Sequence, residues 1–102
     1  MTGTTPAALG VVHDQDRQSF EIALPGGPAV LTYVRAGMVV VLQHTVVPVG
    51  HRGRGLAAEL TRAALAWSAH QGVTVVPQCS YVSHWLTEHP GEIAVAVDRA
   101  QP

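Results

Sequence analysis

Two arginines alternate with two glycines just before the strongest helical pattern of the chain. Arg52, Gly53, Arg54 and Gly55 precede Leu56, after which apolar residues recur at helical spacing. The first N–H groups of a helix lack intrahelical partners and carry partial positive charge, so phosphates and pyrophosphates bind there readily. Glycine lets the backbone approach such an anion closely. The pattern therefore predicts an anion-binding loop, and the alternative is an ordinary glycine-rich turn that opens a surface helix.

Two common phosphate-binding motifs do not fit this segment. The P-loop motif GxxxxGK[ST] requires a lysine, and the chain contains none. The dinucleotide motif GxGxxG requires a third glycine at the position of Ala58. Any anion site here is therefore of another type.

Cys79 is a candidate nucleophile because of its place in the chain. It follows Pro77 at the carboxyl end of a short apolar strand, where α/β sheets tend to place their sites. A free thiol is mostly protonated at neutral pH, so this role would require activation. The alternative is an inert cysteine that packs as a small apolar side chain.

His44 is a candidate proton acceptor. With Gln43 and Thr45 it interrupts an otherwise apolar extended segment, and three polar side chains there are costly if they are buried without partners. The interruption therefore predicts a cleft or a β-bulge. An imidazole titrates near neutral pH and could accept a proton, or it could hold the bulge by hydrogen bonding.

A strand, a loop, a helix and a second strand must position these residues. The extended segment covers residues 38–47, Pro48 and Gly50 end it, and the helix spans residues 55–71 with Gly72 as its stop. The strand of residues 73–76 should lie parallel to the long segment, because a helix connects the two. One face of the helix carries Leu56, Leu60, Ala64 and Trp67.

The remaining segments complete a mixed α/β fold of the α+β type. Residues 11–13 and 19–24 predict a hairpin, and residues 30–35 predict a third strand. Ser83 is expected to cap a short helix that ends near His89, and residues 93–97 can form a last strand. We expect a mixed sheet with antiparallel N-terminal strands, one long central helix and a short C-terminal helix.

Composition and charge exclude several classes of protein. The 102 residues predict a single domain, residues 1–102, with 47% hydrophobic and only 13% charged residues. No apolar run approaches the length of a membrane span, and no secretion signal is recognisable, so we expect a cytoplasmic protein without a membrane partner. A formal net charge of -1 argues against nucleic-acid binding. The single cysteine excludes an internal disulfide.

No metal site is expected, and the aromatic residues fit a packing role. His84 and His89 are five residues apart, which does not place two imidazoles together on a helix. Trp67 falls on the apolar helix face. Trp85 either flanks a bound group or covers the sheet.

The chain resembles the GNAT superfamily of N-acetyltransferases in several motifs that occur in the right order. Arg52-Gly53-Arg54-Gly55-Leu56-Ala57 matches the signature [RQ]-x-x-G-x-[GA], and the wider match includes HTxVP before the loop, PxC after the next strand and a closing HP at 89 and 90. This combination is similar to one subgroup of small stand-alone GNAT-like proteins, and the resemblance covers residues 9 to 97.

The resemblance implies acetyl-CoA as a co-substrate and an unidentified amine as the acceptor. It implies two splayed strands with the pantetheine arm of the cofactor between them, bound by the backbone of Val46 and Val47. The phosphates would be held by Arg52, Gly53, Arg54, Gly55, Leu56 and Ala57. The cysteine of the subgroup lies near the thioester, so an acyl-cysteine at Cys79 is conceivable. Tyr81 could protonate a leaving thiolate, as tyrosines do in larger GNAT enzymes, although core packing is the stronger expectation.

One departure from the resemblance concerns catalysis. Related proteins commonly read HTEVP, whereas this chain reads HTVVP with Val46 in place of the glutamate. Valine cannot accept a proton, so the alternative is a CoA-binding or acyl-CoA-binding module without turnover. A structural or interaction domain is a further alternative, in which residues 52–55 form a solvated turn.

Overall fold

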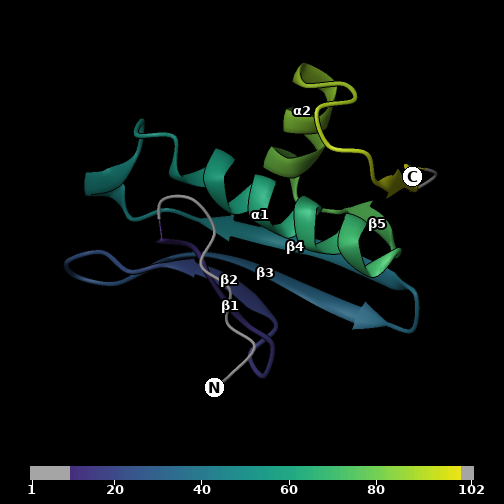
Figure 1. Ribbon diagram of the computed structural model, residues 1–102. Helices are drawn as coiled ribbons and strands as arrows, with labels where there is room; N and C mark the ends of the chain where they lie inside the picture. The colour runs from purple at the N-terminus through teal and green to yellow at the C-terminus, as the bar shows by residue number, and fades with distance from the viewer. Residues whose placement is uncertain (1–9, 100–102) are drawn as a thin grey trace.

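The computed structural model describes residues 10–99 of the chain, which form one six-stranded sheet and two α-helices (Figure 1). The strands lie in the order of the sequence, from β1 to β6. The first four strands pair antiparallel with one another: β1 (Val12–Asp14), β2 (Ser19–Ile22), β3 (Ala29–Ala36) and β4 (Val39–Val46). The parallel strands β5 (Thr74–Pro77) and β6 (Ala96–Val97) follow. This mixed sheet confirms the predicted α+β fold class.

The helices connect the parallel strands and cover one face of the sheet. α1 (Leu56–Gln71) leads from β4 to β5, and α2 (Ser80–Glu88) leads from β5 to β6. Both helices lie on the same side, with α2 resting against α1 (Figure 1). A short 3-10 helix, η2 (Val49–His51), lies between β4 and α1. The predicted parallel pairing of β5 with β4 is confirmed.

Alternation along the strands places the core between the sheet and α1. On β3, Leu31 and Tyr33 are buried whereas Val34 is exposed, as period-2 patterning requires. Leu60 and Leu65 of α1 are fully buried against this face. Gly72 ends α1 in the left-handed conformation at φ 68°, which confirms the predicted stop.

Two elements near the C-terminus differ from the prediction. The short helix begins at Ser80 with Cys79 as its cap, and Ser83 lies inside it, where its N–H donates to the Cys79 carbonyl at 3.0 Å. The helix begins earlier because the Cys79 N–H bonds the Leu42 carbonyl at 2.8 Å, which fixes the turn out of β5. The last strand has two residues instead of five.

Within residues 10–99, neither helix is long and apolar enough to cross a membrane. The same residues contain no group of three histidine, cysteine, aspartate or glutamate side chains that could hold a metal ion.

Candidate functional site

The candidate site lies where β4 and β5 stop pairing. Residues 39–42 of β4 pair with residues 74–77 of β5, and Leu42 is the last partner. Beyond it, β4 continues to Val46 and pairs with β3 alone, while the chain after β5 turns through Cys79 into α2. The β5-facing edge of residues 43–46 therefore pairs with no strand among the described residues.

A β-bulge at the start of this free edge decides which side chains face the helices. Tyr33 pairs with Leu42 and Thr32 pairs with His44, so Gln43 is an extra residue on β4. This confirms the predicted bulge. Because of the extra residue, Leu42 and Thr45 lie on the same face of the sheet although they are three positions apart.

Cys79 is buried at this junction, with 7% of its surface exposed. Its Sγ lies 3.4 Å from Thr45 Oγ1, a distance compatible with a hydrogen bond in which either atom donates. Its backbone caps α2 in an extended conformation, and no side chain bonds the free N–H groups of that helix end. A thiol, a hydroxyl and a helix N-terminus thus meet at the open end of the β4–β5 pair.

The structure does not bring His44 to Cys79. Its register partner Thr32 alternates with the buried Leu31 and Tyr33, so His44 faces the side of the sheet away from the helices. Its side chain is exposed and makes no hydrogen bond or ion pair within the described part of the chain. Thr45, which the sequence analysis named only as part of the polar interruption, faces Cys79 instead, because the register with β3 turns it toward the helices.

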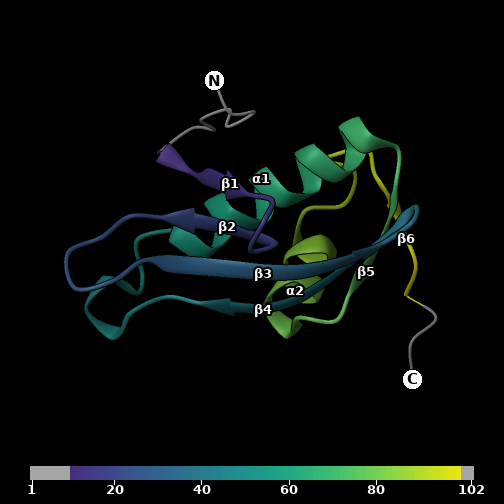
Figure 2. The same ribbon diagram turned by 90° about the horizontal axis from the view of Figure 1, so that it is seen from below.

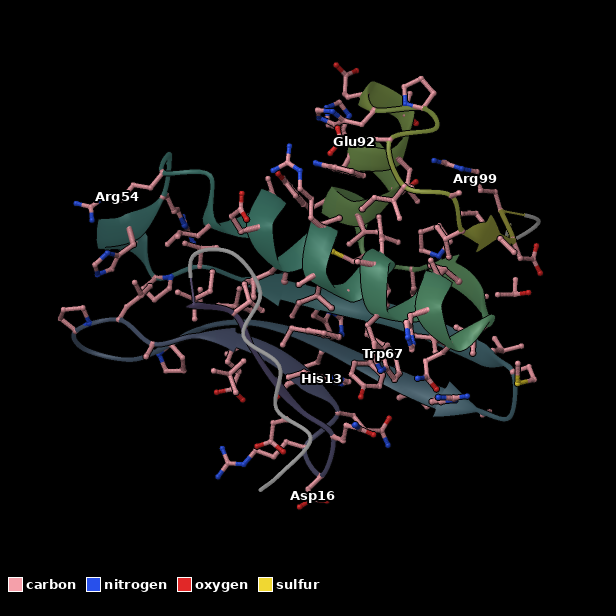
Figure 3. All side chains as sticks on the ribbon, viewed as in Figure 1. His13, Asp16, Arg54, Trp67, Glu92 and Arg99 are labelled. Atoms are coloured by element: carbon pink, nitrogen blue, oxygen red, sulfur yellow. The ribbon has the colours of Figure 1, made fainter. Side chains whose placement is uncertain are left out.

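The predicted anion loop lies between β4 and α1, at the N-terminal end of α1 (Figure 3). Gly53 and Gly55 adopt φ values of 81° and 78°, which side chains disfavour, and Gly55 is the cap of α1. No side chain caps this end, so the N–H groups of Leu56 and Ala57 have no helical partner. The helix therefore begins as the sequence predicts for an anion-binding end.

The two arginines of the loop have different surroundings. Arg52 donates from Nε to the Val47 carbonyl at 3.2 Å and so ties the loop to the end of β4. Arg54 lies at the outer tip of the loop, where its guanidinium is 3.5 Å from His51 Nδ1 (Figure 3). Both side chains are exposed. Arg52 therefore positions the loop, whereas Arg54 is the freer cation.

The aromatic residues of α2 differ in exposure. Tyr81, in the first turn, is 36% exposed, so the expectation that it packs in the core is wrong. Partial burial raises the pKa of Tyr81 and the nearby Arg62 lowers it, with a net increase that keeps the phenol protonated. Trp85 is buried against His89 at 4.4 Å between ring centroids, and no described residue accepts a hydrogen bond from its Nε1.

Comparison with known proteins identifies the family of the chain. Residues 19–95 match the family model described as GCN5-related N-acetyl-transferase. The chain is 36% identical to Protein NATD1 of Mus musculus over 108 aligned residues, which cover 97% of this chain and 96% of the mouse protein. It is 37% identical to Protein NATD1 of Homo sapiens over 97 residues, covering 92% and 84% of the two chains. The chain belongs to the GCN5-related N-acetyltransferase family.

Proposed function

We propose that this protein binds acetyl-CoA and transfers its acetyl group to an amine. The observation that carries the proposal is the unpaired edge of β4 at residues 43–46, which lies between the uncapped N-termini of α1 and α2. Cys79 and Thr45 lie at the α2 end of this edge, and the arginine loop lies at the α1 end. Family membership supports acetyl-CoA as the donor. A cytoplasmic location remains a prediction of the sequence.

The cofactor would lie along β4 with its phosphates at the N-terminus of α1. Unpaired N–H groups of Leu56 and Ala57 and the nearby Gly53 and Gly55 would bind the pyrophosphate, with Arg52 and Arg54 adding positive charge. The amide groups of the pantetheine arm would pair with the backbone of Val46 and Val47, as an added strand pairs with an open edge. The thioester then reaches Cys79.

The chemistry at that end would be acyl transfer through Cys79. The thiolate attacks the thioester carbonyl, CoA leaves as a thiolate, and an acetyl-cysteine forms. The departing CoA thiolate takes up the proton that the Cys79 thiol lost in this first step. The neutral amine then attacks the second thioester, the C–S bond to Cys79 breaks as the amide forms, and the proton lost by the amine restores the Cys79 thiol. Free N–H groups of α2 would stabilise the oxyanion, and the protonated Tyr81 is the candidate donor to the departing CoA.

Titration calorimetry with acetyl-CoA and CoA, followed by intact mass after incubation, tests the proposal. We expect Arg54→Gln to weaken binding about tenfold, because it removes one exposed phosphate contact. We expect one added acetyl group on the wild type and none on Cys79→Ala. His44→Gln should keep the added acetyl group, because His44 lies on the other face. No binding heat and no added mass would contradict the proposal.

Thr45 offers a matched pair of variants for the same assay. We expect Thr45→Val to slow acetylation of Cys79 about fivefold, since a hydroxyl contact of this kind contributes on the order of 1 kcal/mol. Thr45→Ser keeps the hydroxyl and should react like the wild type. Equal rates in the two variants would exclude a role for the hydroxyl.

A second candidate is a CoA-binding module without turnover, and Val46 favours it. Its exposed side chain offers no proton acceptor at the position where relatives commonly carry glutamate. Full binding of acetyl-CoA with no acetylated product across a broad panel of amines would support this candidate instead.

A further inference from the structure

Two basic side chains meet at the tip of the loop between β4 and α1. The guanidinium of Arg54 extends outward, away from the first turn of α1 (Figure 3). Its Nη1 lies 3.5 Å from Nδ1 of His51, the last residue of η2. Because a guanidinium only donates hydrogen bonds, Nδ1 is the acceptor in this contact and the neutral imidazole carries its proton on Nε2. Both side chains keep further N–H donors, and no described residue accepts a hydrogen bond from them.

The surroundings leave the charge of this pair open to a ligand. No described carboxylate forms an ion pair with either side chain. The sequence contains neither aspartate nor glutamate between Glu21 and Glu59, and Glu59 pairs with Arg62 at 3.2 Å on the next turn of α1. The β2–β3 turn, residues 23–28, lies beside the loop in both ribbon views and is uncharged (Figure 1 and Figure 2). The positive charge of Arg54 is thus available to an anion.

The path of the cofactor in the proposed function leads to this pair. The thioester lies at Cys79 and the pyrophosphate at the first N–H groups of α1, so the ribose continues beyond that helix end. The tip of the loop lies on this side, away from α2 (Figure 1). The ribose of CoA carries a 3′-phosphate, a monoester with a charge of about −1.5 to −2 and three terminal oxygens. We propose that His51 and Arg54 together bind the 3′-phosphate of CoA, an inference that rests on the proposed function.

The two kinds of phosphate in CoA would then be bound by different groups. Backbone N–H groups at Leu56 and Ala57 would bind the pyrophosphate, which requires no side chain. The 3′-phosphate would accept hydrogen bonds from Nε2 of His51 and from the outer nitrogens of Arg54, and such charge-assisted contacts are stronger than neutral ones. The pair would therefore select CoA over a ligand that has the same arm and pyrophosphate but lacks the 3′-phosphate.

Titration calorimetry of the full chain with CoA and 3′-dephospho-CoA tests this inference, because the two ligands differ only in that phosphate. At low ionic strength the wild type should bind CoA about tenfold more tightly, since exposed charges are then least screened. Arg54→Gln should reduce this ratio nearly to one, and His51→Gln should reduce it to about threefold, because the imidazole supplies the weaker contact. Neither variant should change the affinity for 3′-dephospho-CoA by more than about twofold.

Arg17→Gln is the matched control. It removes the same charge from the exposed turn between β1 and β2, where 77% of the Arg17 side chain is exposed, and should bind both ligands like the wild type. Circular dichroism establishes that each variant is folded.

The outcomes separate this inference from the proposed function. Equal affinity of the wild type for the two ligands would overturn the 3′-phosphate site and leave the proposed function standing, whereas no binding of either ligand would overturn both. An Arg54→Gln variant that weakens both ligands equally would assign Arg54 to the pyrophosphate and overturn the inference. A His51→Gln variant with the ratio of the wild type would likewise overturn the shared site.

Discussion

His13 belongs to an aromatic cluster that joins the first strands to α1 (Figure 3). Its ring stacks on Phe20 at 4.1 Å between centroids and meets Trp67 at 4.6 Å, and its Nε2 lies 2.6 Å from Tyr33 Oη. Burial lowers the pKa of His13, and the nearby Asp14 only partly opposes this effect. The folded protein therefore favours the neutral imidazole, which can share a hydrogen bond with the Tyr33 hydroxyl.

This protonation preference predicts that the free energy of unfolding depends on pH. The unfolded chain binds a proton at the ordinary pKa of 6.5, whereas the folded chain binds it only at lower pH, so stability is full above about pH 6.5 and falls as pH decreases through that value. Chemical denaturation of the wild type at several pH values measures how steeply the free energy of unfolding changes with pH.

The matched variant for this prediction is His13→Phe. It removes the titrating group, so the slope near pH 6 should decrease. It also leaves the Tyr33 hydroxyl without its partner, which should lower stability at alkaline pH by about 1 to 3 kcal/mol. An unchanged slope in His13→Phe would mean that the other histidines control the pH dependence.

At the scale of elements, the start of α1 depends on the backbone conformation of Gly55. A Cβ at this position would meet no atom within 4 Å, so the cost of a side chain there is conformational and not steric. Gly55→Ala should lower the free energy of unfolding by about 1 to 2 kcal/mol, because φ lies at +78°. Chemical denaturation measures this loss.

Gly50 is the matched control in the same loop. A Cβ added to Gly50 would likewise meet no atom within 4 Å, and the φ of this residue lies outside the positive range. Gly50→Ala should therefore change stability by about 0.5 kcal/mol or less. Equal losses at the two positions would refute the conformational explanation.

Much of the arrangement of elements follows from the sequence, because it depends on local patterns. Helical spacing and the stop at Gly72 predict α1 almost to its ends, and the β-branched residues 73–76 predict β5 beside β4.

The site could be predicted only in part. The polar interruption of residues 43–45 indicates a bulge in the sequence. The pairing register of β4 depends on β3, however, and this register places Thr45 beside Cys79 and His44 on the opposite face of the sheet.

The C-terminal elements depended on contacts that a local pattern does not contain. Ser83 has the right residue type for a cap, but the bond between the Cys79 N–H and the Leu42 carbonyl places the cap four residues earlier, at Cys79. The segment after α2 is instead held by Arg62 of α1, which donates to Glu92 at 2.9 Å, and by His89 at the end of α2, which pairs with the same carboxylate at 3.2 Å. Such half-exposed pairs orient a segment more than they stabilise it.

At the scale of the whole molecule, the proposed cofactor would connect both helix ends and the free edge of β4. A ligand that binds only this folded arrangement stabilises it, by about 2.7 kcal/mol at about 100 times its Kd. For a domain of this size, each kcal/mol raises Tm by roughly 4 to 8 °C. Acetyl-CoA should therefore raise Tm by roughly 10 °C or more, measured by thermal unfolding at one fixed protein concentration.

S-acetylpantetheine, which carries the thioester arm without the nucleotide phosphates, separates the two halves of the proposed site. It should raise Tm much less than acetyl-CoA at the same concentration, because the end of α1 and Arg54 would have no anion to bind. Arg54→Gln should reduce the effect of acetyl-CoA and leave that of S-acetylpantetheine unchanged. Equal shifts from both ligands would show that the arginine loop does not bind the phosphates, and the free edge of β4 would then be the whole of the cofactor site.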